Sequence, residues 1–183
     1  MIKKDILPGK LVWFNALDGL ELQGFLLEPK KRTYKIAIFL PGMGGEFLWK
    51  ELLFSSNILI KNGISFFAIN TRGSGIIKRF YSEKGSLKLG MAFEKFEDCI
   101  KDIGGAIRFV KEIGYKNVIL IGHSTGCQKA VYYLYKTQDK SVKTLVLLSP
   151  TDDYNYNKQK LGRNFDRIIA VSYTHLTLPT SDL

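Results

Sequence analysis

The sequence predicts an α/β protein with a mostly parallel sheet and helices on both faces. Continuous apolar runs of strand length recur at residues 35–40, 64–69, 117–121 and 142–148. Such runs are typical of strands that are buried on both faces. Segments with helical three-to-four spacing lie between them, and strands that alternate with helices favour a parallel sheet with crossover helices on its faces.

Length and composition are those of a single globular domain. The chain has 183 residues, of which 45% are hydrophobic, which is enough for a sizeable core. No apolar run reaches the roughly 20 residues of a membrane span. The charged start, residues 1–5, has no long apolar stretch behind it and is not typical of a signal peptide. We therefore expect a cytoplasmic location.

The basic charge does not point to nucleic acid. Lys and Arg number 27 against 17 Asp and Glu, a formal net charge of +10. The lysines are scattered, no arginine-rich stripe alternates with aromatics, and no nucleic-acid motif is present. Cys99 and Cys127 lack metal-ligand spacing and are interpreted as small core residues. We expect no nucleic-acid partner, no metal and no cofactor.

The chain opens with a predicted β-hairpin over residues 10–28, whose turn is Asp18-Gly19. The apolar alternation predicts a slip at Gly24. After the strand at 35–40 comes a glycine-rich loop, residues 41–45, which allows close approach of the backbone to a ligand. A helix is predicted for residues 46–61 and ends at Asn62-Gly63.

The second half continues the alternation. The strand at 64–69 ends in a turn over residues 70–75, and residues 76–90 are polar, basic and predicted to be irregular. A long amphipathic helix is predicted for residues 91–113. The strand at 117–121, a helix over 127–135 and the strand at 142–148 follow.

Residues 118–128 hold the most informative pattern. A run of four apolar residues enters Gly122-His-Ser-Thr-Gly126, and a helical segment follows at once. This is the context of a Gly-x-Ser-x-Gly nucleophile elbow, in which the turn leaves no room for a Cβ beside Ser124. The N-terminal N–H groups of the following helix would then face an oxyanion. The alternative is a chance glycine-rich turn in another α/β protein.

Four turns are expected to meet at one edge of the sheet. Residues 41–45, 70–75, 122–126 and 149–153 all follow strands, and ligands of open α/β sheets bind at the carboxyl ends of the strands. Their convergence predicts a single site.

These motifs resemble the α/β-hydrolase superfamily. The matching segments are residues 17–22, 39–45, 70–75 and 122–126, and the resemblance covers about residues 10–150. It implies an α/β-hydrolase fold, with Ser124 as nucleophile and the Thr125 N–H as one oxyanion donor. The second donor matches Met43, with Gly44 as the alternative, because Pro41-Gly42 stands where the family has His-Gly or Gly-Gly. His123 occupies a variable elbow position and is expected to pack beside the turn.

The family order of Ser, then Asp or Glu, then His is only superficially present. Asp152 or Asp153 could supply the acid, although a helix N-cap or loop is the simpler interpretation. His175 is rejected on spacing. The family His follows two further βα units, each unit needs roughly 30 residues, and only 26 positions separate Ser149 from His175.

The end of the chain predicts a truncation. Residues 171–183 are similar to tails on unrelated environmental reading frames that resemble translated library-adapter sequence, and such segments are excluded from fold reasoning. We therefore expect a core over residues 1–150, the start of a cap or loop insertion over 151–170, and a non-native tail over 171–183. The last strands, the acid and the His would lie beyond the cut.

The predicted function is that of a serine hydrolase acting on a small-molecule ester or other acyl substrate, of which this chain is the N-terminal part. The alternative is a non-catalytic α/β-hydrolase-fold protein that binds a ligand or partner. If the chain is truncated, its sheet keeps an open edge, so the fragment is expected to have low solubility and little activity.

Overall fold

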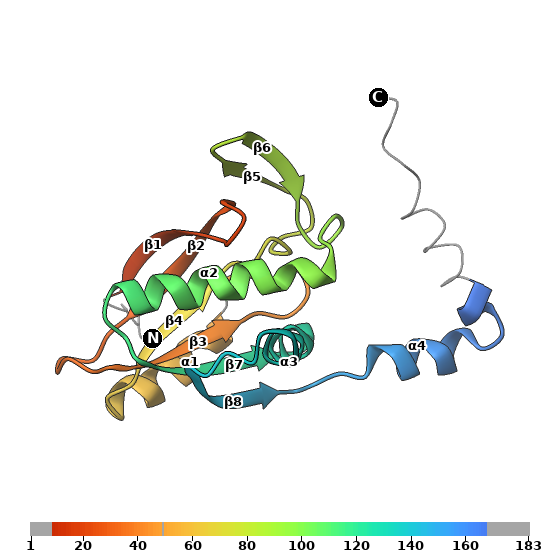
Figure 1. Ribbon diagram of the computed structural model, residues 1–183. Coiled ribbons are helices and arrows are strands. Elements are labelled where there is room, and N and C mark those ends of the chain that lie inside the picture. The colour runs from red at the N-terminus through yellow and green to blue at the C-terminus, as the bar shows by residue number, and fades with distance from the viewer. Residues whose placement is uncertain (1–8, 49, 168–183) are drawn as a thin grey trace, which may run out of the picture. The chain divides into compact units, whose positions relative to one another are not determined.

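The computed structural model describes residues 9–48 and 50–167 (Figure 1). The chain divides into two compact units, Met1–Pro150 and Thr151–Leu183. The first unit contains both sheets of the described chain, and the second contains a short helix. His175 and the predicted tail lie outside the described residues.

The main sheet has six strands in the order β1-β2-β4-β3-β7-β8. The strands are β1 (Lys10–Asn15), β2 (Glu21–Leu27), β3 (Lys35–Leu40), β4 (Ser65–Ile69), β7 (Asn117–His123) and β8 (Val142–Leu148). β1, β2 and β4 pair antiparallel, whereas β4, β3, β7 and β8 are parallel to one another. The predicted mostly parallel sheet is thus confirmed.

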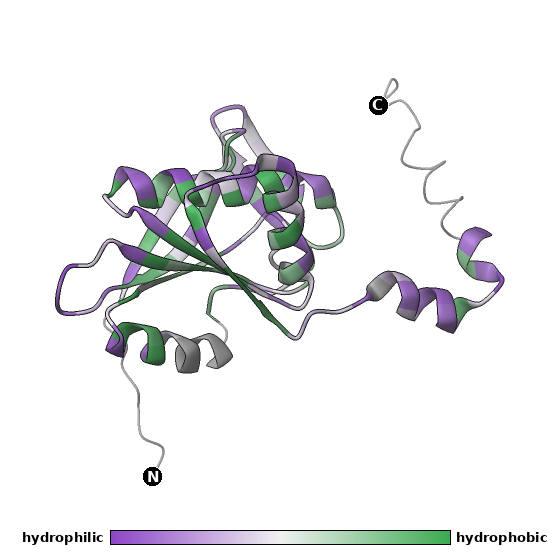
Figure 2. Cartoon of the chain, turned by 60° about the horizontal axis from the view of Figure 1, so that its bottom comes forward, coloured by the Kyte–Doolittle hydropathy of each residue, from purple (hydrophilic) through white to green (hydrophobic). Residues whose placement is uncertain are grey.

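The helices cover both faces of this sheet (Figures 1 and 2). They are α1 (Lys50–Lys61), α2 (Cys99–Glu112) and α3 (Thr125–Thr137). Alternate residues of β3 point to opposite faces: Ile36, Ile38 and Leu40 join the core under α2 and α3, while Ala37 and Phe39 join the core on the α1 side. The continuous apolar run of β3 arises because both of its faces are buried.

The opening hairpin forms as expected, but the predicted slip at Gly24 is wrong. β1 and β2 pair without a register shift, and Val12 lies opposite Gly24. Gly24 packs against β4, where a Cβ would stand 2.5 Å from the Phe67 ring. The glycine therefore serves close packing rather than a bulge.

Two helices begin later than their apolar spacing predicts. α1 begins at Lys50 rather than at residue 46, and in the loop before it the Phe47 N–H donates to the Asn70 side chain at 3.0 Å. α2 begins at Cys99 rather than at residue 91, after a short 3-10 helix at Phe96–Asp98. The C-terminus of α1 is as predicted, since Gly63 adopts a φ of 72° and the Ile64 N–H returns to the Leu59 carbonyl.

Residues 76–90 are not irregular, and that prediction is corrected. They form an antiparallel hairpin of β5 (Lys78–Ser82) and β6 (Gly85–Leu89), which stands apart from the main sheet in Figure 1. Only Phe80 among its strand residues is buried. A hairpin that buries one apolar side chain has no alternating pattern for sequence analysis to detect.

The second unit contains α4 (Asp153–Leu161). The Asp152 side chain accepts the Asn155 N–H at 3.1 Å, so Asp152 is the N-cap of this helix, as the simpler interpretation of its position predicts. The helix ends at Leu161 with Gly162 as its C-cap, and residues 164–167 are helical again. No helix in the described part of the chain is long and apolar enough to cross a membrane.

Candidate active site

Ser124 lies in the turn between β7 and α3, in a strained backbone conformation. Its φ is 52° and its ψ is −124°, a region that side chains rarely adopt. The Ser124 N–H donates to the Leu148 carbonyl at the end of β8 (3.0 Å), and its carbonyl accepts the Cys127 N–H (2.9 Å). The surrounding backbone thus holds the strained turn in place.

Three glycines let the backbone close around this turn. A Cβ on Gly122 would lie 2.4 Å from the Gly126 carbonyl oxygen, and one on Gly126 would lie 2.4 Å from the Leu40 oxygen. A Cβ on Gly42 would come within 3.0 Å of the Ser124 Cβ. The sequence-based expectation that Gly122 and Gly126 leave no room for a side chain agrees with these distances.

The loop after β3, residues 41–47, is attached to the turn after β4. Gly44 forms an isolated parallel bridge with Ser74, and its carbonyl accepts the Gly75 N–H at 3.0 Å. The Phe47 N–H donates to the buried Asn70 side chain. The turns after β3, β4 and β7 therefore meet at the carboxyl edge of the sheet, as predicted for three of the four segments.

The two backbone N–H groups that the sequence assigns to an oxyanion belong to Thr125 and to Met43 or Gly44. Thr125 is the first residue of α3, so its N–H has no partner within the helix. Among the backbone hydrogen bonds of the described residues, none begins at the Met43 N–H. The Gly44 N–H begins none of these bonds either, because the printed bond of its bridge to Ser74 uses the Gly44 carbonyl, so both donors that the sequence allows stay open.

The two side chains that flank this turn differ in their roles. Cys127 is buried, with its Sγ 3.1 Å from the Gly122 carbonyl oxygen and 3.3 Å from that of Leu148, and burial raises the pKa of its thiol. It is a core residue, as expected. The His123 Nδ1 lies near Gly42, 3.5 Å from where a Cβ would stand, so this ring packs beside the loop.

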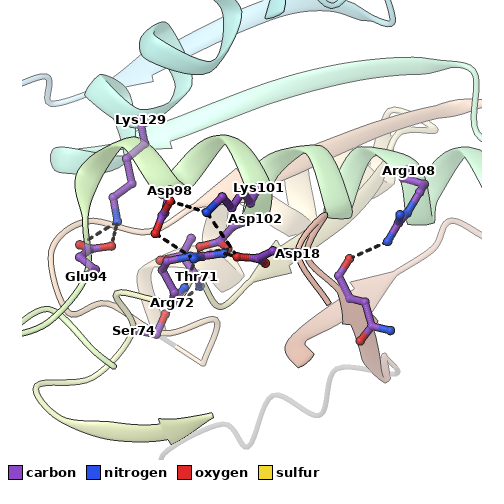
Figure 3. A network of polar contacts seen from close by, with 11 residues as sticks. Asp18, Thr71, Arg72, Ser74, Glu94, Asp98, Lys101, Asp102, Arg108 and Lys129 are labelled. Carbon is purple, nitrogen blue, oxygen red and sulfur yellow. Dashed lines mark hydrogen bonds and ion pairs between the residues drawn. The ribbon is translucent and has the colours of Figure 1, made fainter. Parts of the chain in front are cut away.

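A buried charge cluster supports the turn after β4 (Figure 3). The Arg72 Nε and backbone N–H both donate to the Asp102 carboxylate, at 2.9 and 2.8 Å, and its guanidinium also reaches Asp18 and Asp98. Burial opposes the charge of Arg72, but the carboxylates outweigh it and raise the pKa of the guanidinium. The cluster thus gives the turn at residues 72–75 a structural role.

Sequence analysis missed a second buried pair, Lys129 with Glu94. Both carboxylate oxygens accept from the Lys129 Nζ, at 2.7 and 2.9 Å. Lys129 shares the buried side of α3 with Cys127, Ala130 and Tyr133. A lysine at apolar spacing in a helix was the one available signal, and its partner, 35 positions earlier, had none.

Exposed apolar side chains border the loop after β3. They lie in the loop itself and in two segments that hydrogen-bond to one another, since the Met91 and Ala92 N–H groups donate to the Gly75 and Ile76 carbonyls. The exposed set comprises Met43, Ile76, Ile77, Met91 and Phe93. We call this set the apolar rim.

A hollow of about 330 Å³ lies at the opposite, amino edge of the parallel strands. It is bordered by the basic run Lys30, Lys31 and Arg32 and by the buried Tyr115 and Ser65. The Tyr115 hydroxyl is 2.8 Å from the Ser65 Oγ and 2.9 Å from a Glu28 carboxylate oxygen. This hollow is far along the strands from Ser124 and shares no residue with its surroundings.

Among the described residues of the first unit, no carboxylate or histidine hydrogen-bonds to the Ser124 hydroxyl. Asp153 begins α4 in the second unit, and Asp152 is engaged as its N-cap. Within the described part of the chain, no hydrogen bond joins the Ser124 hydroxyl to a histidine or a carboxylate.

Solved structures with the same fold are α/β hydrolases and esterases. An α/β hydrolase from Penicillium has a TM-score of 0.67 at 20% identity, over 93% of this chain and 55% of its own. An esterase from Pyrococcus furiosus has a TM-score of 0.63 at 19% identity, over 94% of this chain and 65% of its own. Est1E from Butyrivibrio proteoclasticus, solved with ferulic acid, has a TM-score of 0.64 at 18% identity, over 81% of this chain and 57% of its own.

A sequence relative is similar along most of this chain. It is a Mycoplasma genitalium protein with the provisional name esterase/lipase 2, which is 32% identical over 143 residues. These residues make up 77% of this chain and 47% of the relative. The chain thus spans about half the length of this relative.

Sheet order, helix placement and these structures define the class as the α/β hydrolases. The chain belongs to the serine aminopeptidase S33 family (Hydrolase_4), whose family model matches residues 32–182. The match runs into residues 171–182, which we expect to be non-native, so the origin of that tail stays a prediction.

Proposed function

We propose that this chain is the N-terminal part of a serine hydrolase that cleaves an ester or other acyl substrate through Ser124. The observation that carries the proposal is the backbone conformation of Ser124. This residue has a φ of 52° and lies between a buried strand and the first turn of α3. This is the strand–turn–helix context of a nucleophile elbow. The esterase/lipase name of the Mycoplasma relative supports an ester substrate.

In the proposed reaction, the Ser124 Oγ bonds to the substrate carbonyl carbon while a base takes the hydroxyl proton. The carbonyl oxygen becomes an oxyanion between the N–H groups of Met43 and Thr125, each worth about 3 kcal/mol to the transition state. The C–O bond to the leaving alcohol breaks, and the alcohol takes the proton from the base. Water then hydrolyses the acyl-enzyme and restores the Ser124 hydroxyl.

The base and the acid of this reaction are proposed to lie beyond residue 170. Two observations support this. The distance from Ser149 to His175 is too short for two further βα units, and this chain spans only about half the length of its Mycoplasma relative. The N-cap role of Asp152 also argues against that residue as the acid.

The test uses the complete gene product. The source gene is read again from the codon for Phe165 onward, from an independent library, and the full-length protein is treated with a fluorophosphonate probe. We expect labelling of the wild type and none of Ser124→Ala. A folded full-length protein that stays unlabelled would overturn the proposal.

A second candidate is a non-catalytic member of the fold that binds a ligand or partner. It is favoured by one observation: in the described part of the chain, Ser124 has no histidine or carboxylate partner. Finding Val171 to Leu183 in genomic sequence would support this candidate, and so would a complete gene without a His after its last strand.

A further inference from the structure

The ion pair of Lys129 and Glu94 is buried to a degree that is unusual for charged side chains. The Lys129 side chain is 2% exposed and that of Glu94 is 13% exposed. Taking two charges out of water is costly, so a buried pair is weak support for stability by itself. The position of the pair in the fold suggests a different role (Figure 3).

Lys129 belongs to the same helix as one of the proposed oxyanion donors. It lies four residues after Thr125, about one turn along α3. Its Nζ binds both oxygens of Glu94, which fixes the carboxylate in orientation as well as in distance. Lys129 therefore ties Glu94 to the first turns of α3, and Glu94 cannot move without breaking these hydrogen bonds.

Glu94 belongs to a segment that is joined to the turn after β4. The Glu94 N–H donates to the Gly90 carbonyl, and the Gly90 N–H donates to the Arg72 carbonyl at 2.8 Å. The Glu94 carboxylate also covers Gly73, where a Cβ would stand 2.1 Å from Oε2. Glu94 thus clamps the turn at residues 72–75.

That turn holds the loop with the other proposed donor. The Gly75 N–H donates to the Gly44 carbonyl at 3.0 Å, and the Met91 N–H donates to the Gly75 carbonyl at 2.9 Å. The Met91 sulfur also packs on Gly44, 2.8 Å from where a Cβ would stand. A continuous path of contacts therefore runs from Lys129 to the residue after Met43.

We propose that Lys129 and Glu94 are positioning residues that set the spacing between the Met43 and Thr125 N–H groups. This inference rests on the proposed function, because it assigns those groups to an oxyanion. The close backbone contacts of Gly42 with Ser124 and of Gly126 with Leu40 fix one side of the site. The ion pair fixes the other side, through Glu94 and the turn after β4.

The variants Lys129→Met and Glu94→Gln test the proposal in the full-length protein. Each is compared with the control Lys10→Met. Lys10 lies in the first strand and forms an exposed ion pair with Glu28. The readouts are kcat and KM for a p-nitrophenyl ester and the affinity for an alkyl boronic acid, whose serine adduct carries a tetrahedral anion. A thermal melt reports folding.

Displacing the two N–H donors reduces their stabilisation of the transition state more than their binding of the ester. We expect Lys129→Met to lower kcat by about 10- to 100-fold with little change in KM, and to weaken boronate binding in parallel. Glu94→Gln keeps an acceptor for the lysine and should lose less. Lys10→Met should change neither readout. A lower melting temperature with unchanged kcat and boronate affinity would overturn the proposal.

Hydrogen exchange of the backbone amides separates this proposal from the proposed function. Exchange in the peptides around residues 41–48 and 123–128 should rise in Lys129→Met and not in Lys10→Met. If the wild type is inactive, the proposed function fails, and the exchange pattern still decides whether the pair holds these two segments. Unchanged exchange in both peptides would overturn the positioning role whatever the activity.

Discussion

The two edges of the parallel sheet are built in different ways. At the carboxyl edge, glycines let backbone segments meet at distances that exclude a Cβ, and Ser124 is held at a positive φ. At the amino edge, exposed basic side chains surround a hollow whose buried polar groups, Tyr115 and Ser65, bind one another. The carboxyl edge depends on backbone geometry and buried charge, whereas the amino edge depends on side chains that can adjust. Substitutions should therefore cost much more at the carboxyl edge.

The largest loss is expected for Arg72→Met. This change leaves the fully buried Asp102 carboxylate without its partner, which should lower the free energy of unfolding by about 3–5 kcal/mol. Urea denaturation followed by circular dichroism measures it. Arg108→Met is the matched control on α2, where the pair with Glu112 is exposed. Equal losses in the two variants would contradict the assignment of Arg72 to a buried cluster.

The next largest effect is expected for Gly126→Ala. It should lower the free energy of unfolding by about 3 kcal/mol, because the new Cβ meets the Leu40 and Pro41 carbonyl oxygens. Gly63→Ala is the control, since Gly63 has a φ of 72° but open space around it. It should cost only about 1 kcal/mol, the penalty of the left-handed conformation. The same denaturation experiment applies, and a tolerated Gly126→Ala would show that the loop after β3 can move away.

At the amino edge, Tyr115→Phe should cost about 1 kcal/mol, because it removes one hydroxyl from the contacts with Ser65 and Glu28. Burial raises the pKa of Tyr115 to about 12, so the hydroxyl stays protonated at neutral pH. Thermal melts of the two proteins give the difference. A loss as large as that of Arg72→Met would remove the contrast between the two edges.

The smallest effect is expected from Glu28 at low pH. The hydrogen bond from Lys10 lowers the pKa of this carboxyl, so its contribution to stability is present above the unfolded value of about 4.3 and is lost as the pH falls through the folded value. Urea midpoints measured from pH 6 to pH 3 should fall less steeply in Glu28→Gln. The pair is exposed, so 1 M salt should abolish the difference. An unchanged difference in salt would show that the pair is not screened.

Sequence analysis placed the strands well and the helix starts poorly. The bounds of β3 and β8 are as expected, because apolar runs with polar flanks define a buried strand by themselves. The segments before α1 and α2 instead make contacts with distant residues. Asn70 binds the Phe47 N–H, and Arg72 binds the Gly90 N–H. No local periodicity contains that information.

The candidate site divides in the same way. The roles of Gly122 and Gly126 follow from the sharpness of one local turn, so the sequence was sufficient to predict them. The choice between Met43 and Gly44 as oxyanion donor depends on the loop after β3, which is held by the distant turn after β4. The pair of Lys129 and Glu94 joins a helix to a segment 35 positions earlier, and only the folded chain brings them together.

The glycines of the carboxyl edge and the apolar rim should differ in how much substitution they tolerate. Gly122 and Gly126 leave no room for a Cβ and Gly42 leaves little, so substitution at these positions should disturb the turn. The side chains of Met43, Ile76 and Phe93 are exposed beside the loop after β3 and are free of that constraint. This exposed surface can therefore be varied while the backbone around Ser124 stays as it is.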